Sequence, residues 1–322
     1  MYKLKVVDDV EECACIWKKH WDATSLFDLW DVRNCFVDSF KRNNIFIVLE
    51  NGGDIQGVLP LSWIGESNFY SFFPGESWHG KTWLEQNKVF AADNNAFQIL
   101  INNIPGPAHM RYMSANSLYF NDSLTFDESN YHLYPGEFDY NFDGYMQKFS
   151  SKSRKNLSKE VSLFYEMGAK LRYNKLEDIE ALFEMNLAAY EEDSYFKDPR
   201  FYNSFQSLLK WLYDNKLLRI VTVEIGGKIA AVDIASQYGS EYVVLCGGTN
   251  PEFPGIAKLI NFHHIEWSCW NRMRKIDFLC GDFGWKERFH LTSKPLYEIN
   301  LLTAQEAKLS EGQREDTGTY GI

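Results

Sequence analysis

Apolar and polar residues along the chain follow spacings that predict alternating strands and helices. Alternation with period two is typical of half-buried strands, and stripes at spacings of three and four are typical of helices packed on a sheet. Asn51-Gly52-Gly53-Asp54 separates two apolar runs and predicts a hairpin, because glycine tolerates a positive φ. Around this hairpin the first half predicts strands at 3–7 and 68–73, helices at 9–21, 26–42 and 95–103, an irregular stretch at 74–94, and short strands and loops at 110–142.

The second half repeats this order. It predicts strands at 169–175, 218–225, 228–237, 241–247, 275–280 and 295–302, with helices at 178–190, 200–215 and 256–272. Residues 303–322 are polar and lack periodicity, which is typical of a disordered tail. Strand, two helices, a three-strand meander, helix and strand together predict a mixed α/β class.

Residues 44–73 and 218–247 also share a sequence pattern. Glu50-Asn51-Gly52-Gly53-Asp54-Ile55 matches Glu224-Ile225-Gly226-Gly227-Lys228-Ile229, and Lys3-Leu4-Lys5 matches Lys170-Leu171-Arg172. Solenoid repeats are only about 20–50 residues long, so a repeat of this size indicates a duplicated domain. We expect one domain at 1–143 and a second at 144–302.

Three stretches of the second half resemble the double-GNAT acyltransferases, which include the CelD-like acetyltransferases and the related FemABX peptidyltransferases. They are 149–157, 247–259 and 277–286. The resemblance covers 145–302 well, and the first half only through its likeness to the second. It implies a tandem duplicated GNAT (acyl-CoA N-acyltransferase) fold. Each copy would have a mixed, mostly antiparallel sheet flanked by helices, and the first copy would be degenerate.

The resemblance also implies that an acyl-CoA donor lays its pyrophosphate on the start of the 256–272 helix, where free N–H groups favour anions. Pro254-Gly255 permits close backbone approach, although Glu252 and Phe253 stand where simple GNAT enzymes have a Gly-rich segment preceded by Arg or Gln. An ordinary loop is the alternative. The predicted donor-binding residues are Cys246, Gly247, Thr249, Gly255, Ile256, Ala257 and Lys258.

Three residues are candidates for catalysis. Asp233 lies mid-strand among apolar residues, where burial would raise its pKa toward that of a useful base, and the first copy has Leu59 at this position. Asp282 could accept the proton of an attacking amine, and Lys286 could hold an anionic group. Structural roles remain open for all three: a hydrogen-bonded Asp233, and a turn-capping ion pair of Asp282 with Lys286.

Other polar side chains have weaker claims. Cys246 could relay an acyl group, but a buried inert thiol is the plainer interpretation. His263 fits core packing, and His264 has no assigned role. The basic run that enters the second domain has a family counterpart in the substrate groove, so Lys152, Arg154 and Asn156 are predicted substrate contacts. A solvated helix face is the alternative.

Charge and cysteine usage narrow the class of protein. The 322 residues carry a net charge of −11, which argues against general nucleic-acid binding. The six cysteines show no metal-ligand spacing, so we expect reduced thiols, no metal and a cytoplasmic protein. No apolar run reaches the roughly 18 residues of a membrane span.

These observations leave three functional hypotheses. The first is an N-acyltransferase that moves an acyl group from acetyl-CoA or another acyl-CoA to a small-molecule or peptide amine. The second is FemABX-like transfer from aminoacyl-tRNA, which the acidic charge disfavours. The third is a non-catalytic binding module on a decayed GNAT scaffold. The sequence predicts neither the acceptor nor the oligomeric state.

Overall fold

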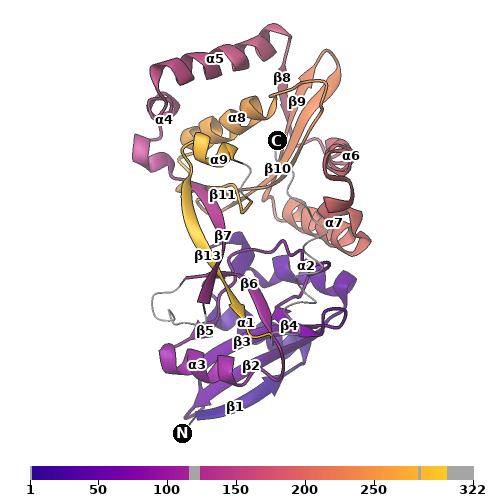
Figure 1. The fold of residues 1–322 in the computed structure, drawn as a ribbon, viewed down its shortest axis with the longest axis vertical. Helices are drawn as coiled ribbons and strands as arrows, with labels where there is room; N and C mark the ends of the chain where they lie inside the picture. The colour runs from indigo at the N-terminus through magenta and orange to yellow at the C-terminus, as the bar shows by residue number, and fades with distance from the viewer. Residues whose placement is uncertain (1, 116–123, 282–283, 303–322) are drawn as a thin grey trace. The chain divides into compact units, whose positions relative to one another are not determined.

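The computed structural model describes residues 2–115, 124–281 and 284–302 (Figure 1). The chain forms two compact units. The first contains the residues up to Ser129, the segment Pro199–Leu208 and the residues from Pro295, and the second contains Asn130–Asp198 and Leu209–Lys294. The division falls at 129/130 instead of 143/144, because His132 and Leu133 pair with a strand of the second unit. The tail predicted at 303–322 lies outside the described residues.

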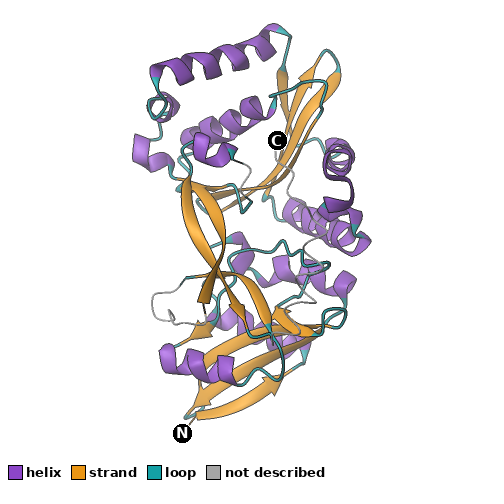
Figure 2. Ribbon diagram, in the orientation of Figure 1, coloured by secondary structure: helices purple, strands orange, loops and turns teal. Residues whose placement is uncertain are grey.

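The first unit is built on a mostly antiparallel sheet with strand order β1-β2-β3-β4, to which β5 is added beside β3. Helices flank this sheet (Figure 2). The elements of the first unit are β1 (Tyr2–Val7), α1 (Val10–His20), the 3-10 turn η1 (Leu26–Asp28), α2 (Trp30–Phe40), β2 (Asn43–Asn51), β3 (Asp54–Ile64), β4 (Phe69–Phe72), β5 (Phe90–Ala91), α3 (Asn94–Asn102) and β6 (His109–Ser114).

The single helix predicted at 26–42 is broken at Leu29, which has extended dihedral angles. Backbone carbonyls before the break bond to side chains instead of to a following helical turn. The Trp17 indole donates to the Asp28 carbonyl at 2.7 Å, and the Arg33 guanidinium donates to the Phe27 carbonyl at 2.8 Å. The tertiary contacts therefore divide a pattern that is locally helical.

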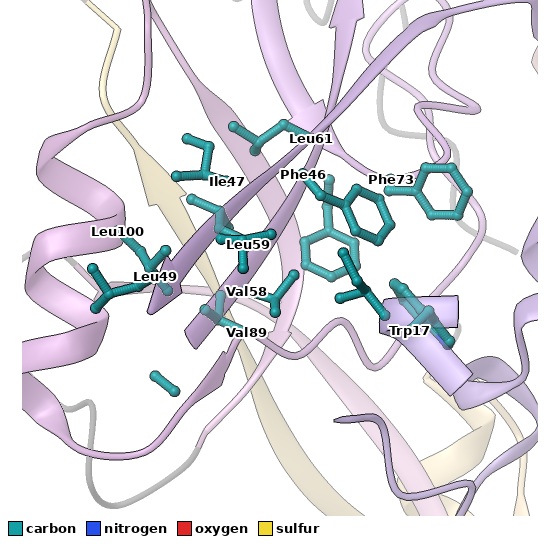
Figure 3. Packing of buried hydrophobic residues seen from close by; sticks show 14 of the residues in the cluster. Trp17, Phe46, Ile47, Leu49, Val58, Leu59, Leu61, Phe73, Val89 and Leu100 are labelled. Atoms are coloured by element: carbon teal, nitrogen blue, oxygen red, sulfur yellow. The ribbon is translucent and has the colours of Figure 1, made fainter. Parts of the chain in front are cut away.

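Apolar side chains pack around Leu59 in the core of the first unit. Figure 3 shows Leu59 beside Val58 and Leu49, with Trp17 and Phe73 nearby. Leu59 is fully buried. This position matters below, because it corresponds to Asp233 in the repeat.

The second unit is built on a sheet in which strands follow the order β7-β12-β11-β10-β9-β8. Helices α6 and α8 cover opposite faces of β9, β10 and β11 (Figure 1). Strands β7 and β13 and helix α7 carry residues of both units. The elements are β7 (Leu124–Leu133), α4 (Phe142–Met146), α5 (Ser151–Glu166), β8 (Lys170–Tyr173), α6 (Asp178–Tyr190), α7 (Pro199–Asp214), β9 (Leu218–Ile225), β10 (Lys228–Tyr238), β11 (Glu241–Thr249), α8 (Ala257–Trp270), β12 (Lys275–Asp277), α9 (Trp285–Arg288) and β13 (Thr292–Asn300).

The repeated sequence forms the same hairpin in each unit. Both glycines of each pair have positive φ, as the hairpin prediction required. In each hairpin one extra residue interrupts the ladder at the matching place, Gln56 in β3 and Ala230 in β10. The strand before the hairpin also pairs in the same register, Lys3 with Glu50 and Lys170 with Glu224. The sequence alignment is thus also a structural alignment, and Leu59 of the first unit occupies the position that Asp233 occupies in the second.

Candidate functional site

Strands β11 and β12 of the second unit run parallel for only three residue pairs. Glu241, Tyr242 and Val243 pair with Lys275, Ile276 and Asp277, after which β12 ends while β11 continues to Thr249. The β11 edge from Val244 onward therefore has no ladder partner on that side among the described residues. Unpaired backbone N–H and C=O groups on a strand can bind an extended ligand as an added strand.

The chain turns sharply after β12, although the sequence predicted a strand up to residue 280. The Asp277 carboxylate accepts hydrogen bonds from the Leu279 amide at 2.9 Å and from Asn130 at 3.1 Å, with His132 at 3.2 Å. Burial alone would raise the pKa of Asp277, but the hydrogen bond and charge of His132, with Lys275, hold it well below its usual range. Leu279 takes a φ of 59°, a left-handed conformation that ends the strand.

Lys286 on α9 holds this turn together. Its ammonium donates to the carbonyls of Phe278, Leu279 and Cys280 at 2.9, 2.8 and 2.6 Å, and it lies 5.1 Å from the centre of the Tyr131 ring. The residue is 2% exposed. This geometry favours a structural role for Lys286 over the predicted contact with an anionic group. Asp282 lies outside the described residues.

Asp233 on β10 is one end of a buried polar chain. Its Oδ2 lies 3.0 Å from His264 Nε2 on α8, and His264 Nδ1 lies 2.9 Å from the Tyr242 hydroxyl on β11. Asp233 is 5% exposed, and His264 and Tyr242 are fully buried. The other carboxylate oxygen, Oδ1, has no hydrogen-bond partner among the described residues. Asp233 is thus held at one oxygen and open at the other.

The open oxygen of Asp233 faces Gly247 on the unpaired part of β11. Asp233 and Gly247 are cross-strand partners, and a Cβ added at Gly247 would lie 2.1 Å from Oδ1. No side chain can fit there unless Asp233 moves. Gly248 is also constrained, because its Cβ would lie 3.0 Å from the Leu182 carbonyl and from Met185 Cβ on α6. Gly247 is thus required by packing against Asp233, and Gly248 by packing against α6.

Cys246 lies on the same strand, but its thiol is poorly suited to a covalent step. Burial raises the pKa of Cys246 well above its usual value, and the nearby Asp233 carboxylate raises it further. The thiolate is the nucleophilic form of cysteine. This environment therefore favours the inert interpretation of Cys246 over an acyl relay.

The start of α8 holds most of the other predicted donor-binding residues. Gly255 has a φ of 84°, Ile256 is buried at the N-cap position, and no side chain caps the helix. However, the amides of Ile256 and Lys258 bond to the carbonyls of Phe253 and Gly255 at 3.1 Å, and Lys258 pairs with Glu160 of α5. Fewer N–H groups are therefore available to an anion than the sequence suggested.

The predicted substrate contacts on α5 do not share one face. The helix begins after Ser150, whose hydroxyl accepts from the Ser153 amide at 3.2 Å. Lys152 and Asn156 project from the exposed side, whereas Arg154 lies half-buried and bonds to Gln147. Lys155 and Lys159 continue the exposed side. None of the three lysines has an ion-pair partner among the described residues.

Sequence reasoning missed His264 and Tyr242. The signal was present in the hairpin register: β10 and β11 pair Gln237 with Tyr242, so Tyr242 shares a face with Asp233, which lies four residues before Gln237. His264 lies one helical turn after Ile260, on the face that α8 buries. Within the described residues, no group of three His, Cys, Asp or Glu side chains is placed to hold a metal, and no helix has the length and apolarity to span a bilayer.

Comparison with known proteins identifies the fold. Residues 151–287 match the family model described as acetyltransferase (GNAT) domain, while the chain matches no curated protein by sequence. Similar solved structures include FemX, with a TM-score of 0.57 and 10% identity over 95% of this chain and 99% of that chain. L-PGS from Bacillus licheniformis has a TM-score of 0.59 and 10% identity over 95% and 96%. A tandem GNAT protein from the clavulanic acid biosynthesis pathway has 0.51 and 10% over 94% and 100%. The predicted GNAT fold is confirmed.

Proposed function

We propose, from the match of residues 151–287 to the acetyltransferase (GNAT) domain model, that the second unit transfers an acyl group from a thioester such as an acyl-CoA to an amine. The observation that carries the proposal is the unpaired edge of β11 beside the open oxygen of Asp233. The donor would lie along β11 as an added strand. A backbone N–H near 246–248 would polarise its carbonyl.

The reaction would be a direct displacement. The amine nitrogen forms a bond to the thioester carbonyl carbon, and the carbon–sulfur bond breaks with its electron pair leaving on sulfur. The amine loses one proton, which Asp233 accepts at Oδ1, and the thiolate takes up a proton from solvent. The raised pKa of the Cys246 thiol supports this direct route over one through an acyl-cysteine.

The donor contacts proposed here are unequal in strength. Cys246, Gly247 and Thr249 offer backbone groups along the β11 edge. Gly255, Ile256, Ala257 and Lys258 at the start of α8 would receive the pyrophosphate, but the turn bonds and the Lys258–Glu160 pair would compete for it. We therefore expect the strand edge to contribute more to donor affinity than the helix start.

One observation favours a second donor, an aminoacyl-tRNA. Lys152, Lys155 and Lys159 form an exposed stripe along α5, and none has an ion-pair partner among the described residues. An unpaired basic stripe in a chain of net charge −11 suits a polyanion, because neutralised phosphates release bound counterions. Asp233 would serve this reaction in the same way, with an ester replacing the thioester.

The test is to offer both donors to the purified full chain. A panel of acyl-CoAs with small-molecule and peptide amines is followed by thiol release, and aminoacyl-tRNA with the same amines by transfer of labelled amino acid. Asp233→Asn should lower turnover with the true donor by about 10²–10⁴-fold, the usual contribution of a general base. Replacing the three α5 lysines with glutamine should weaken only a tRNA donor.

The outcomes separate the hypotheses. Thiol release that depends on both amine and Asp233 supports the CoA donor, and salt-sensitive transfer that needs the α5 lysines supports tRNA. Binding of a donor without turnover would support the non-catalytic module. Absence of binding and turnover with both donors would contradict the proposed function.

A further inference from the structure

A line of buried polar groups crosses the α8 face of the second unit's sheet and ends at Asp233. Behind the Asp233–His264–Tyr242 contacts lies Arg219 of β9, whose guanidinium stands beside the Tyr242 hydroxyl. Arg219 lies 4.2 Å from the centre of the Trp267 ring and 4.9 Å from that of Tyr173. Strand β10, helix α8 and strand β11 thus each contribute one group to the hydrogen-bonded chain, and Arg219 lies beside its Tyr242 end.

The ends of this chain fix the direction of its hydrogen bonds. The ionised carboxylate of Asp233 can only accept, so His264 donates through Nε2–H. In a neutral imidazole Nδ1 is then an acceptor, and the Tyr242 hydroxyl donates to it. Every donor therefore points toward Asp233.

The fold itself does not need these polar groups. In the first unit the equivalent of Asp233 is Leu59, which packs in an apolar core with Val58 and Leu49 (Figure 3). Buried polar groups cost free energy unless every one is hydrogen-bonded, so an apolar residue is the simpler solution at this position. The polar chain occurs only in the second unit of the pair, beside the part of β11 that has no partner strand among the described residues. Its location therefore points to chemistry at that edge.

We propose that His264 and Tyr242 are positioning residues that hold Asp233 in the orientation needed to accept a proton from the amine at Oδ1. The inference rests on the proposed function and names residues that the reaction itself does not touch. His264 fixes Oδ2, which leaves Oδ1 directed at Gly247. Tyr242 fixes the tautomer of His264. When Asp233 accepts one proton, the hydrogen bond from His264 stays in place and no other group changes charge.

Other ionisable groups pack around His264 and the ends of the chain. Burial lowers the pKa of the adjacent His263 to about 3, and Arg219 approaches its Nε2 at 3.2 Å. Burial raises the pKa of Tyr242 well above its usual value, although Arg219 opposes the rise. Cys246 on β11 remains a neutral thiol near Asp233. The carboxylate and the guanidinium are therefore the charged ends of the chain.

The experiment compares two buried tyrosines of the second unit, one whose hydroxyl bonds to His264 and one whose hydroxyl bonds elsewhere. Tyr242→Phe removes the hydroxyl that orients His264. Tyr145→Phe is the matched control, because Tyr145 is also fully buried in the second unit and its hydroxyl makes one bond, to the Phe289 carbonyl at 2.8 Å. Turnover, KM and the pH profile of kcat are measured for both variants of the full chain. The tautomer of His264 is read by NMR of ¹⁵N-histidine-labelled protein.

Tyr242→Phe should lower kcat about tenfold with little change in KM, the effect of one lost hydrogen bond on an oriented group. Its pH profile should shift, and the Nε2–H tautomer should lose population. Tyr145→Phe should lower stability to a similar degree and change none of these. Equal kinetics and pH profiles for the two variants would overturn the proposal.

The NMR measurement does not depend on enzymatic activity. If the wild type transfers no acyl group from either donor, the proposed function fails, but the hydrogen-bond chain is still tested. Asp233→Asn should then change the ring-nitrogen shifts of His264 away from a single Nε2–H tautomer. Shifts that are identical in wild type and Asp233→Asn would refute the chain itself.

Discussion

Replacing Lys286 with methionine distinguishes a structural lysine from a ligand-binding one. The substitution keeps most of the apolar part of the side chain but removes the ammonium, which donates to three buried carbonyls and lies over the Tyr131 ring. Each carbonyl left without a donor costs ~1–3 kcal/mol, so three cost ~3–9 kcal/mol before relaxation. Removing a buried ammonium returns several kcal/mol of its desolvation penalty. We therefore expect Lys286→Met to lower the free energy of unfolding by ~2–4 kcal/mol.

The measurement is thermal unfolding of the full chain, with donor affinity determined on the same samples. A loss of this size should lower the melting temperature by ~5–15 °C. Lys258→Met is the control: its ammonium pairs with Glu160 near the surface and is 38% exposed, so its loss should cost less than ~1 kcal/mol. A Lys286→Met protein that melts with the wild type but binds donor more weakly would refute this reasoning and restore the role predicted from the sequence.

Two further predictions concern the same unit. Gly247→Ala should lower the free energy of unfolding by ~2 kcal/mol or more and lower turnover, since the new Cβ would lie 2.1 Å from the Asp233 carboxylate. Gly65→Ala is the control, because the atom nearest to its new Cβ would be 3.9 Å away. Equal melting temperatures for the two variants would contradict the clash. Burial holds the pKa of His263 at about 3 in the folded protein against ~6.5 in the unfolded chain, so stability is full above pH ~6.5 and falls as the pH drops toward 3. Urea unfolding at several pH values should show a smaller acid dependence for His263→Gln, and an unchanged dependence would rule this effect out.

Local signals in the sequence predicted most of the elements because they depend on spacing alone. The glycine pairs produced both hairpins, since positive φ is needed there whatever surrounds the turn. The strands at β9, β10 and β11 and the helices at α6 and α7 lie within a residue or two of the predicted ranges. The repeat also predicted a shared register, because a duplicated hairpin retains its bulge.

Two of the errors occur where a side chain bonds to backbone carbonyls of a neighbouring element. The helix predicted at 26–42 breaks because Trp17 and Arg33 bond to carbonyls before Leu29. The strand predicted to residue 280 ends at Asp277, because Lys286 binds the following carbonyls. Neither competition has a spacing that a sequence pattern reveals.

The sequence by itself determined that the chain contains a duplicated hairpin and that the second copy carries a carboxylate where the first has leucine, and its motifs predicted the GNAT fold of this copy. These properties depend on residue type and spacing, which the chain displays directly. Only the tertiary structure decided that His264 and Tyr242 hold Asp233 and that Lys286 supports a turn. Such roles depend on which elements meet in space, and hydrogen-bond partners separated by tens of residues leave no local periodicity.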